Sequence, residues 1–198
     1  MTTTDDITAI TNVVLRERAS RDTAQWEAMR SCFTPDSHVQ LSWFTGTGPE
    51  FTDASQRMYD AGSRSFHDIG AVSVDIVGDR ALAHEPCAVH AQGSLAGVAI
   101  TLTSHGRLYQ RLIRTESGWR IAGLTMLYYQ DIVGLTNPAD DPSPLAGYEF
   151  PTARPFKYLA AVLAERGYTV DDDIPGTDRP EVTAQYLDAH HRWLHGGS

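Results

Sequence analysis

From residue 66 onward, apolar and polar side chains alternate with a period of two, and the alternation persists to about residue 130. The alternating segments lie near 66–77, 80–93, 98–114 and 118–130. They are separated by glycine-containing turn signals, namely Gly78-Asp79, the run from Gly93 to Gly97, and Glu116-Ser117-Gly118. A period of two is typical of strands with one buried face, and short breaks of this kind predict hairpins. We therefore expect long antiparallel strands joined by hairpins.

Before residue 66 the apolar side chains recur at helical spacing instead. Three helices are indicated, by the sets Ile7-Ile10-Val14, Trp26-Met29-Phe33 and Phe51-Ala54-Met58-Ala61. We expect the first helix to begin at an N-cap at Thr4 and end near residue 19, and the second to begin at a cap at Thr23 and end in a turn at residues 34–36. A strand over residues 38–43 separates the second helix from the third.

Helices followed by long hairpin strands predict an α+β fold, in which a curved antiparallel sheet wraps around the N-terminal helices. We expect bulges at Gly70 and Pro86 to bend the sheet and leave a cone-shaped cavity. At 198 residues, of which 41% are hydrophobic, the chain is long enough for one domain with an appendage. We assign residues 1–134 to the α+β domain.

Residues 135–198 form a proline-rich linker and a helical C-terminal extension. Phe156, Leu159 and Leu163 predict one helix, ended by Gly167, and a second begins near Pro180. Their apolar faces must be covered. We expect residues 151–194 to roof the cavity of their own subunit or to pack across a homodimer interface; the alternative is that they cover the outer face of the sheet.

The charge balance limits the class of partner. A net charge of −9 with scattered basic residues argues against nucleic acid and anionic membranes. Neither a long apolar run nor a signal-peptide pattern is visible, so we expect a cytoplasmic protein. Cys32 and Cys87 lack metal-type spacing and are expected to be buried free thiols. We find no phosphate-binding glycine loop and no metal motif, and therefore expect no cofactor.

Asp22 and His67 are the leading candidates for catalysis. Asp22 lies at a helix–helix joint and His67 at the start of a strand, where a carboxylate and an imidazole can meet in one cavity. A carboxylate that accepts one ring N–H fixes the tautomer and leaves the other nitrogen basic. We expect the pair within about 2.6–3.2 Å of each other. The alternative interpretation is that Asp22 only caps the following helix.

Five segments, in this order, carry a family resemblance: Asp22-Thr23-Ala24-Gln25-Trp26, Phe33-Thr34-Pro35-Asp36, Phe66-His67-Asp68-Ile69-Gly70, Gly78-Asp79 and Gly118 to Leu124. Over residues 5–135 the chain resembles the SnoaL-like branch of the nuclear-transport-factor-two superfamily, which has a cystatin-like fold. Within that superfamily it is most similar to the scytalone dehydratase family. The resemblance implies Asp22, His67 and His90 as catalytic residues, with His90 as a proton donor to a leaving hydroxyl or as a donor that polarises a substrate oxygen. If a bulge at Pro86 does not reverse the register, we expect His84 and His90 to face the same side of their strand.

Other positions are candidates for the substrate-binding wall. His105 and Tyr109 share a strand face and, with Tyr128, are expected to line or close the cavity. Leu41 and Arg21 stand where the scytalone dehydratases have tyrosines, and Gly106 replaces a serine. Because those substrate-reading groups are missing, scytalone itself is not the expected substrate.

These observations predict a cofactor-independent lyase, a hydro-lyase that acts by acid–base catalysis on a small hydrophobic, carbonyl-activated or cyclic molecule. The alternatives within the same fold are an isomerase, a polyketide-cyclase-like enzyme and an epoxide hydrolase. A non-catalytic ligand-binding or dimerisation module is the alternative of a different class. We expect a homodimer or higher homo-oligomer.

Overall fold

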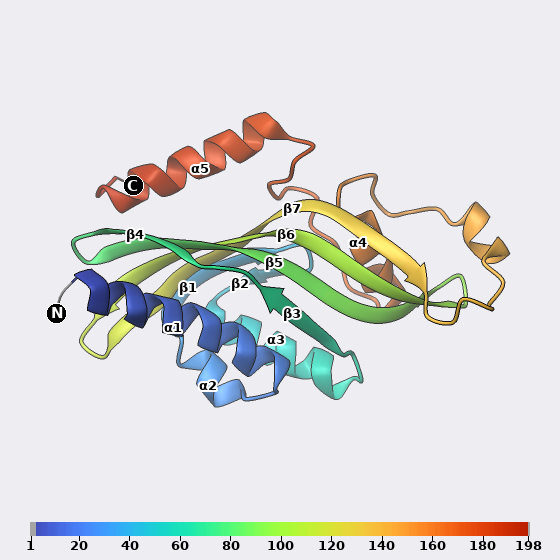
Figure 1. Ribbon diagram of the computed structural model, residues 1–198, viewed down its shortest axis with the longest axis horizontal. Helices are drawn as coiled ribbons and strands as arrows, with labels where there is room; N and C mark the ends of the chain where they lie inside the picture. Colours follow the sequence, from blue (N-terminus) through green and yellow to red (C-terminus); the bar gives the residue numbers. More distant parts are fainter. Residues whose placement is uncertain (1–2, 198) are drawn as a thin grey trace.

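The computed structural model describes residues 3–197, in which a long curved sheet has helices on both sides (Figure 1). The helices are α1 (Thr3–Asp22), α2 (Trp26–Arg30), α3 (Gly48–Asp60), the 3-10 helix η1 (Ser143–Gly147), α4 (Lys157–Glu165) and α5 (Pro180–Leu194). The strands are β1 (Phe33–Leu41), β2 (Phe44–Gly46), β3 (Ser65–Ile69), β4 (Ser73–Val77), β5 (Arg80–Leu95), β6 (Val98–Thr115) and β7 (Gly118–Leu135). The α+β class and the long hairpin strands are confirmed.

The strands follow the order β2-β1-β7-β6-β5-β3, and β4 pairs with β5 beyond the end of β3. All pairs are antiparallel except β1 with β7, which is parallel. The register of β5 against β6 is unbroken from Arg80 opposite Ile113 to Leu95 opposite Val98. One face of β5 and one face of β6 therefore stay on one side of the sheet along the whole length of these two strands.

The irregularities that bend the sheet are not at the predicted positions. They lie in the β6–β7 ladder, between His105 and Gly106 and between Arg111 and Leu112. Pro86 pairs in register with β6, and its carbonyl accepts a hydrogen bond from Gly70 N at 2.9 Å. The nitrogen of Pro86, which carries no hydrogen, therefore faces the gap between β3 and β4, where no neighbouring strand needs a backbone N–H donor.

Two local predictions near the N-terminus are wrong. The helix α1 continues to Asp22. It ends there because Ala24 adopts a positive φ of 57° and Gln25 N donates to Ser20 O at 2.8 Å. The predicted turn at residues 34–36 is the beginning of β1. The register of β1 against β7 shifts between residues 33 and 38, so Pro35 falls where the ladder is interrupted.

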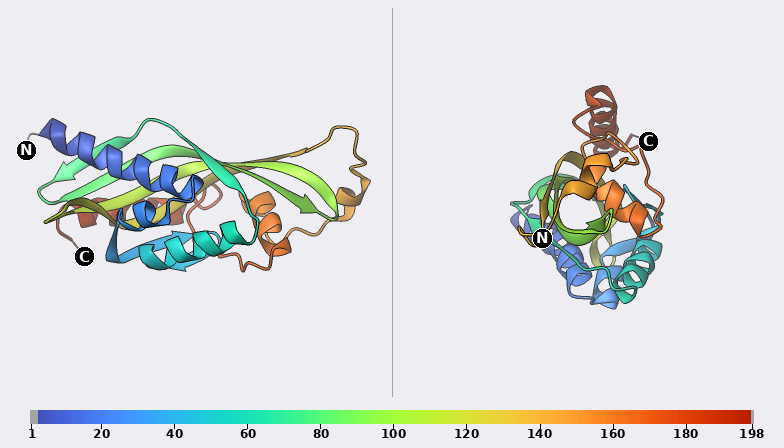
Figure 2. Two further views of the ribbon diagram at one scale, coloured as in Figure 1. Left: turned by 90° about the horizontal axis from the view of Figure 1, so that it is seen from below. Right: turned by 90° about the vertical axis from the view of Figure 1, so that its right-hand side faces the viewer.

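The two sides of the sheet carry different helices (Figure 2). The N-terminal helices α1 to α3 lie on the concave side, where Ile10, Val14 and Phe51 are fully or almost fully buried. The start of α1 is fixed by Asp6, which accepts two hydrogen bonds of 2.8 Å from Arg114. None of the helices in residues 3–197 is long and apolar enough to cross a bilayer.

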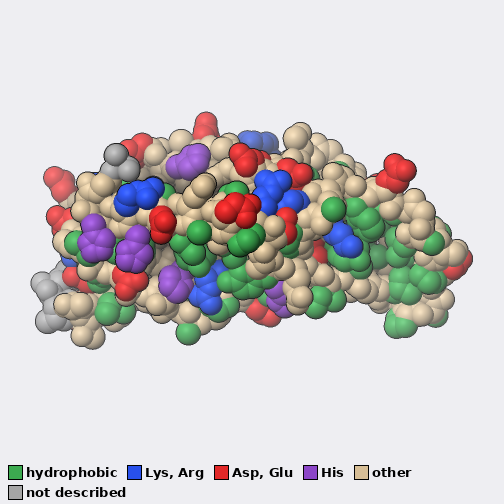
Figure 3. Space-filling model, turned by 90° about the horizontal axis from the view of Figure 1, so that it is seen from above, with side chains coloured by type: hydrophobic (Ala, Val, Ile, Leu, Met, Phe, Trp, Pro, Cys, Tyr) green, Lys and Arg blue, Asp and Glu red, His purple; other side chains and the backbone are tan. Residues whose placement is uncertain are grey.

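The C-terminal extension is divided between the two sides. On the concave side, α4 buries Phe156, Leu159 and Leu163 as predicted, and Val162 packs so closely on Gly93 that a Cβ there would lie 2.9 Å from it. On the opposite side, α5 runs along the convex face. The extension thus roofs the cavity with one helix and covers the outer face with the other. The face that carries α5 has acidic, basic and histidine side chains interspersed (Figure 3).

Candidate active site

A cavity lies between the concave face of the sheet and the helices α1, α3 and α4. It holds about 670 Å³ of empty space, its open mouth included. Most of its wall is apolar, formed by Leu41, Trp43, Phe51, Met58, Val89, Ala91, Leu108, Met126, Leu159, Val162 and Leu163. The polar side chains that face it are few: Arg18, Arg21, Ser63, Ser65, His67, Tyr128 and Arg166, with the thiol of Cys87. An apolar cavity with a few polar groups is typical of small-molecule sites.

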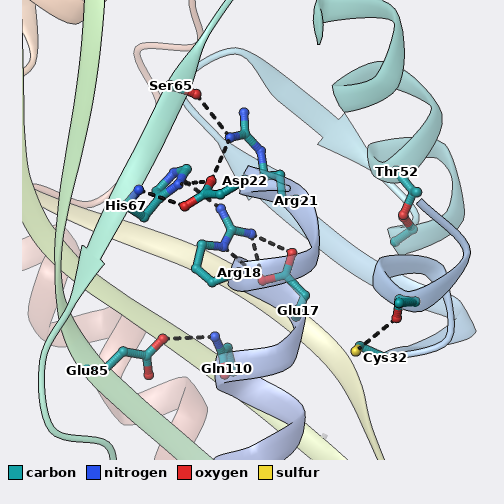
Figure 4. A network of polar contacts seen from close by, with 12 residues as sticks. Glu17, Arg18, Arg21, Asp22, Cys32, Thr52, Ser65, His67, Glu85 and Gln110 are labelled. Atoms are coloured by element: carbon teal, nitrogen blue, oxygen red, sulfur yellow. Dashed lines mark hydrogen bonds and ion pairs between the residues drawn. The ribbon is translucent and has the colours of Figure 1, made fainter. Parts of the chain in front are cut away.

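Asp22 and His67 meet in the wall of this cavity (Figure 4). Asp22 Oδ1 lies 2.7 Å from His67 Nδ1, and Asp22 Oδ2 accepts the backbone N–H of His67, also at 2.7 Å. Both carboxylate oxygens are therefore used to hold one residue of β3. The distance agrees with the expected range, and the last residue of α1 is joined to the strand rather than capping α2.

The pairing decides the protonation of the imidazole. Because Asp22 is acceptor-only when ionised, the Nδ1 of His67 carries the proton and Nε2 presents a lone pair. The His67 side chain is only 5% exposed. Burial lowers the pKa of His67 to about 3, aided by the charges of Arg18 and Arg21 and opposed by Asp22. Burial alone would raise the pKa of Asp22, but the hydrogen bonds from His67 lower it below the usual range.

A buried ion pair on α1 adjoins the imidazole and was missed from the sequence. Arg18 donates to Glu17 in a bidentate manner, with distances of 2.9 and 2.5 Å, and both residues are almost fully buried. Arg18 Nη1 also donates to His67 Nε2, at a long 3.5 Å. Burial opposes the charge of Arg18, but Glu17 outweighs it and the pKa of Arg18 is raised. Arg18 is therefore a fixed cation beside the basic nitrogen.

Arg21, Leu41 and Tyr128 line the cavity as expected. Arg21 donates to Ser65 Oγ at 3.2 Å. The Tyr128 hydroxyl donates to Ser42 Oγ at 3.0 Å and accepts from Ser42 N at 3.2 Å, so it is engaged within the wall. Burial raises the pKa of Tyr128 to about 12.

His90 lies on the other side of the sheet, and its predicted place in the cavity is wrong. It stacks on Phe66 with ring centroids 4.7 Å apart, and its Nε2 lies 3.0 Å from Asp68 Oδ2. The prediction that His84 and His90 share a face is confirmed, but that face is the convex one. The register through Pro86 is unbroken, so the cavity-facing residues of β5 are Cys87, Val89 and Ala91.

The prediction that His105 and Tyr109 line or close the cavity is wrong for the same reason, because both lie on the convex face. They alternate with Ser104, Gly106 and Leu108, which are buried on the concave side. Tyr109 instead packs under α5, 6.2 Å from the rings of both Tyr186 and His190. Neither His105 nor Tyr109 reaches the cavity.

Buried polar groups also lie near the floor of the site. Burial raises the pKa of the Cys87 thiol to about 12, so that group stays protonated; it and Cys32 are free and buried, as expected. Glu85 is fully buried and accepts from Gln110 Nε2 at 3.0 Å. Within residues 3–197, no three His, Cys, Asp or Glu side chains gather in a way that could hold a metal ion.

Comparison with known proteins agrees with this architecture. A family model described as a SnoaL-like domain matches residues 2–125. No curated protein sequence matches the chain. A protein of Kribbella flavida, Kfla4162, is similar in structure, with a TM-score of 0.59 and 18% identity over 66% of this chain and 95% of that one.

Two further solved structures bear names of enzymes. A protein of Novosphingobium aromaticivorans, named as a candidate scytalone dehydratase, has a TM-score of 0.55 and 14% identity over 68% of this chain and 93% of its own. A hexachlorocyclohexane dehydrochlorinase has a TM-score of 0.57 and 12% identity, over the same shares of the two chains. At these identities the likeness concerns the fold.

Proposed function

This chain belongs to the SnoaL-like domain family, and from that membership and the geometry of its cavity we propose that it is a cofactor-independent lyase of the dehydratase kind. The observation that carries the proposal is the Asp22–His67 pair, whose unprotonated Nε2 lies in the wall of an apolar cavity and accepts only a long contact from Arg18. The names of two structural neighbours, a dehydratase and a dehydrochlorinase, both describe eliminations.

In the proposed reaction, His67 Nε2 removes a proton from the carbon next to a carbonyl group. The electron pair moves into the carbonyl oxygen, and Asp22 holds the imidazolium that forms. When the electrons return, the carbon–oxygen bond on the neighbouring carbon breaks, and the departing hydroxide takes the proton back from Nε2. The products are a conjugated double bond and water. With His90 on the far face, one imidazole acts as base and then as acid.

The two arginines give this step its electrostatic support. The low pKa of His67 keeps the imidazole neutral and available as a base. A histidine with so low a pKa is a weak base, because burial and the charges of Arg18 and Arg21 disfavour its protonation. Negative charge developing on the substrate oxygen beside Arg18 and Arg21 offsets that repulsion, because a fixed cation stabilises an oxyanion strongly in a water-poor site. His67 is therefore expected to accept a proton readily only when a bound substrate develops negative charge beside the arginines.

The test is a double-mutant cycle of Asp22→Asn and His67→Gln, assayed with cyclic aryl β-hydroxy ketones by the absorbance of the conjugated product. Each single variant should lose roughly 10²- to 10⁴-fold in kcat/KM. The double variant should equal the worse single variant, because the carboxylate acts through the imidazole. Multiplicative losses would contradict the shared role.

The chain supplies a matched control. Asp68 and His90 form a second hydrogen-bonded pair, from the neighbouring strands β3 and β5, on the convex face. Asp68→Asn and His90→Gln should therefore leave turnover within about twofold of the unchanged protein. Equal losses in both pairs would mean that the strands, and not the cavity pair, account for the effect.

A further inference from the structure

The charged side chains in the cavity wall are all positive. Three arginines, Arg18, Arg21 and Arg166, face the cavity, and none of its lining residues is an aspartate or glutamate. Arg18 is neutralised from behind by Glu17, and Arg166 at the mouth donates to Gln92 O at 2.6 Å. Because Arg166 is exposed to solvent, Arg21 remains as the buried cation whose charge is least compensated.

Arg21 lacks the partners that a buried guanidinium normally has. Its side chain is 10% exposed, and its Nε is buried without a hydrogen-bond partner. Asp22 Oδ1, 3.8 Å away, is already engaged by His67. Burial lowers the pKa of Arg21 to about 10. A buried cation with an unused donor costs free energy unless an anion completes its shell.

A smaller hollow adjoins the cavity at this point. It holds about 240 Å³ of empty space, mouth included, and shares Arg21, Ser63 and Ser65 with the main cavity. Ser55, which is 3% exposed, also lines it, and its hydroxyl is a second buried polar atom without a partner. Ser65 accepts from Arg21 and keeps its own O–H to donate. One arginine and three serines thus line the hollow, together with Trp26, Met58 and Tyr59.

We infer that this hollow is an anion-binding subsite, and that the substrate carries a carboxylate, bound by Arg21 and Ser55, on an apolar body that fills the main cavity. A guanidinium matches a planar carboxylate in shape and charge. The inference rests on the proposed function for the reaction, and it adds the chemical class of the molecule. The anionic end enters the hollow beside Arg21, and the apolar body carries the reacting carbon to His67.

Binding of a matched pair of probes, 2-naphthoate and the neutral 2-naphthamide, measured by calorimetry on the full chain, tests the subsite. The unchanged protein should bind the carboxylate at least tenfold more tightly than the amide. Arg21→Gln should remove that preference and leave the affinity for the amide unchanged, which also shows that the variant is folded. Arg21→Lys should keep part of the preference, and Ser55→Ala should reduce it.

The control is Arg16→Gln, which removes an exposed arginine from the same helix and should keep the full preference. Equal affinity for the two probes, no binding of the carboxylate, or an unchanged preference in Arg21→Gln would each overturn the subsite. His67→Gln separates this inference from the proposed function. It should abolish turnover and retain the preference for the carboxylate, so either idea can fail without the other.

Discussion

Glu85 offers a quantitative test of the floor beneath the site. Its side chain is fully buried, and burial raises the pKa of Glu85 from 4.5 to about 8. Glu85 Oε2 and Gln110 Oε1 are both buried without a partner, while Gln110 Nε2 donates to Glu85 Oε1. A protonated carboxyl group that donates to the amide oxygen satisfies both orphan atoms. We therefore predict that Glu85 is neutral at pH 7 and that Glu85→Gln preserves the pairing.

The sign and size of the effect follow from proton linkage. Between pH 4.5 and 8 the folded state holds a proton on Glu85 that the unfolded state has lost, so the free energy of unfolding falls as pH rises. With a pKa of about 8 in the folded state, the Glu85 contribution falls by about 2.5 kcal/mol between pH 6 and pH 9. The Glu85→Gln variant lacks this titration.

Urea unfolding of both proteins at pH 6 and pH 9 measures the difference directly. Other groups titrate alike in the two proteins, so subtraction at each pH isolates Glu85. The free energy of unfolding of Glu85→Gln, relative to that of the parent protein, should be about 2.5 kcal/mol higher at pH 9 than at pH 6. The control Glu116→Gln, at the exposed β6–β7 turn, should show no such difference. Parallel curves for the parent and Glu85→Gln would show that Glu85 is ionised in the folded protein and would refute the argument.

Two other predictions concern the base and the roof. Because the pKa of His67 is about 3, about 99% of the base is neutral at pH 5, and kcat/KM should be flat from pH 8 to pH 5; a decline centred near pH 6.5 would contradict the burial argument. Asp131 accepts from Leu159 N at 2.7 Å at the start of α4, and from Ser104 at 2.5 Å. Asp131→Ala should lower the free energy of unfolding by about 1–2 kcal/mol and speed hydrogen exchange in α4, whereas unchanged exchange there would show that the carboxylate does not hold the roof.

The sequence predicted the strands well because their signal is local. The alternation of side chains and the glycine turns fix β5, β6 and β7 without knowledge of their neighbours. The turn predicted at residues 34–36 was wrong because a tertiary contact overrides the local preference. Pro35 and Asp36 favour a turn, but β7 pairs with β1 on both sides of them, at Phe33 and from His38 onward, and keeps the segment extended. The bulges were misplaced because Pro86 is accommodated by the gap between β3 and β4, which only the assembled sheet contains.

Side-chain parity explains which predicted site residues reach the cavity. Sequence parity grouped His84 with His90 correctly, but parity alone does not say which face of a strand is concave. The neighbours settle that question: Phe66 pairs with His90 outside, and His67 pairs with Val89 inside. Asp22 was found because it stands at the end of α1, and His67 was found because it lies close to the start of the short strand β3.

Arg18 was overlooked although the helix itself indicates it, whereas Arg21 was expected in the cavity wall. After the buried Asp6, the stripe of α1 is apolar at Ile10 and Val14, and the same helical spacing continues to Arg18 and Arg21. A stripe that changes from apolar to charged within one helix marks the point where the helix leaves the packed core and meets a cavity. Each charge on such a stripe needs compensation. Arg18 receives it from Glu17 at hydrogen-bond distance, whereas Arg21 has only Asp22 at 3.8 Å, which His67 already engages. Arg21 is therefore the residue of the stripe from which the chemistry of the ligand is best inferred.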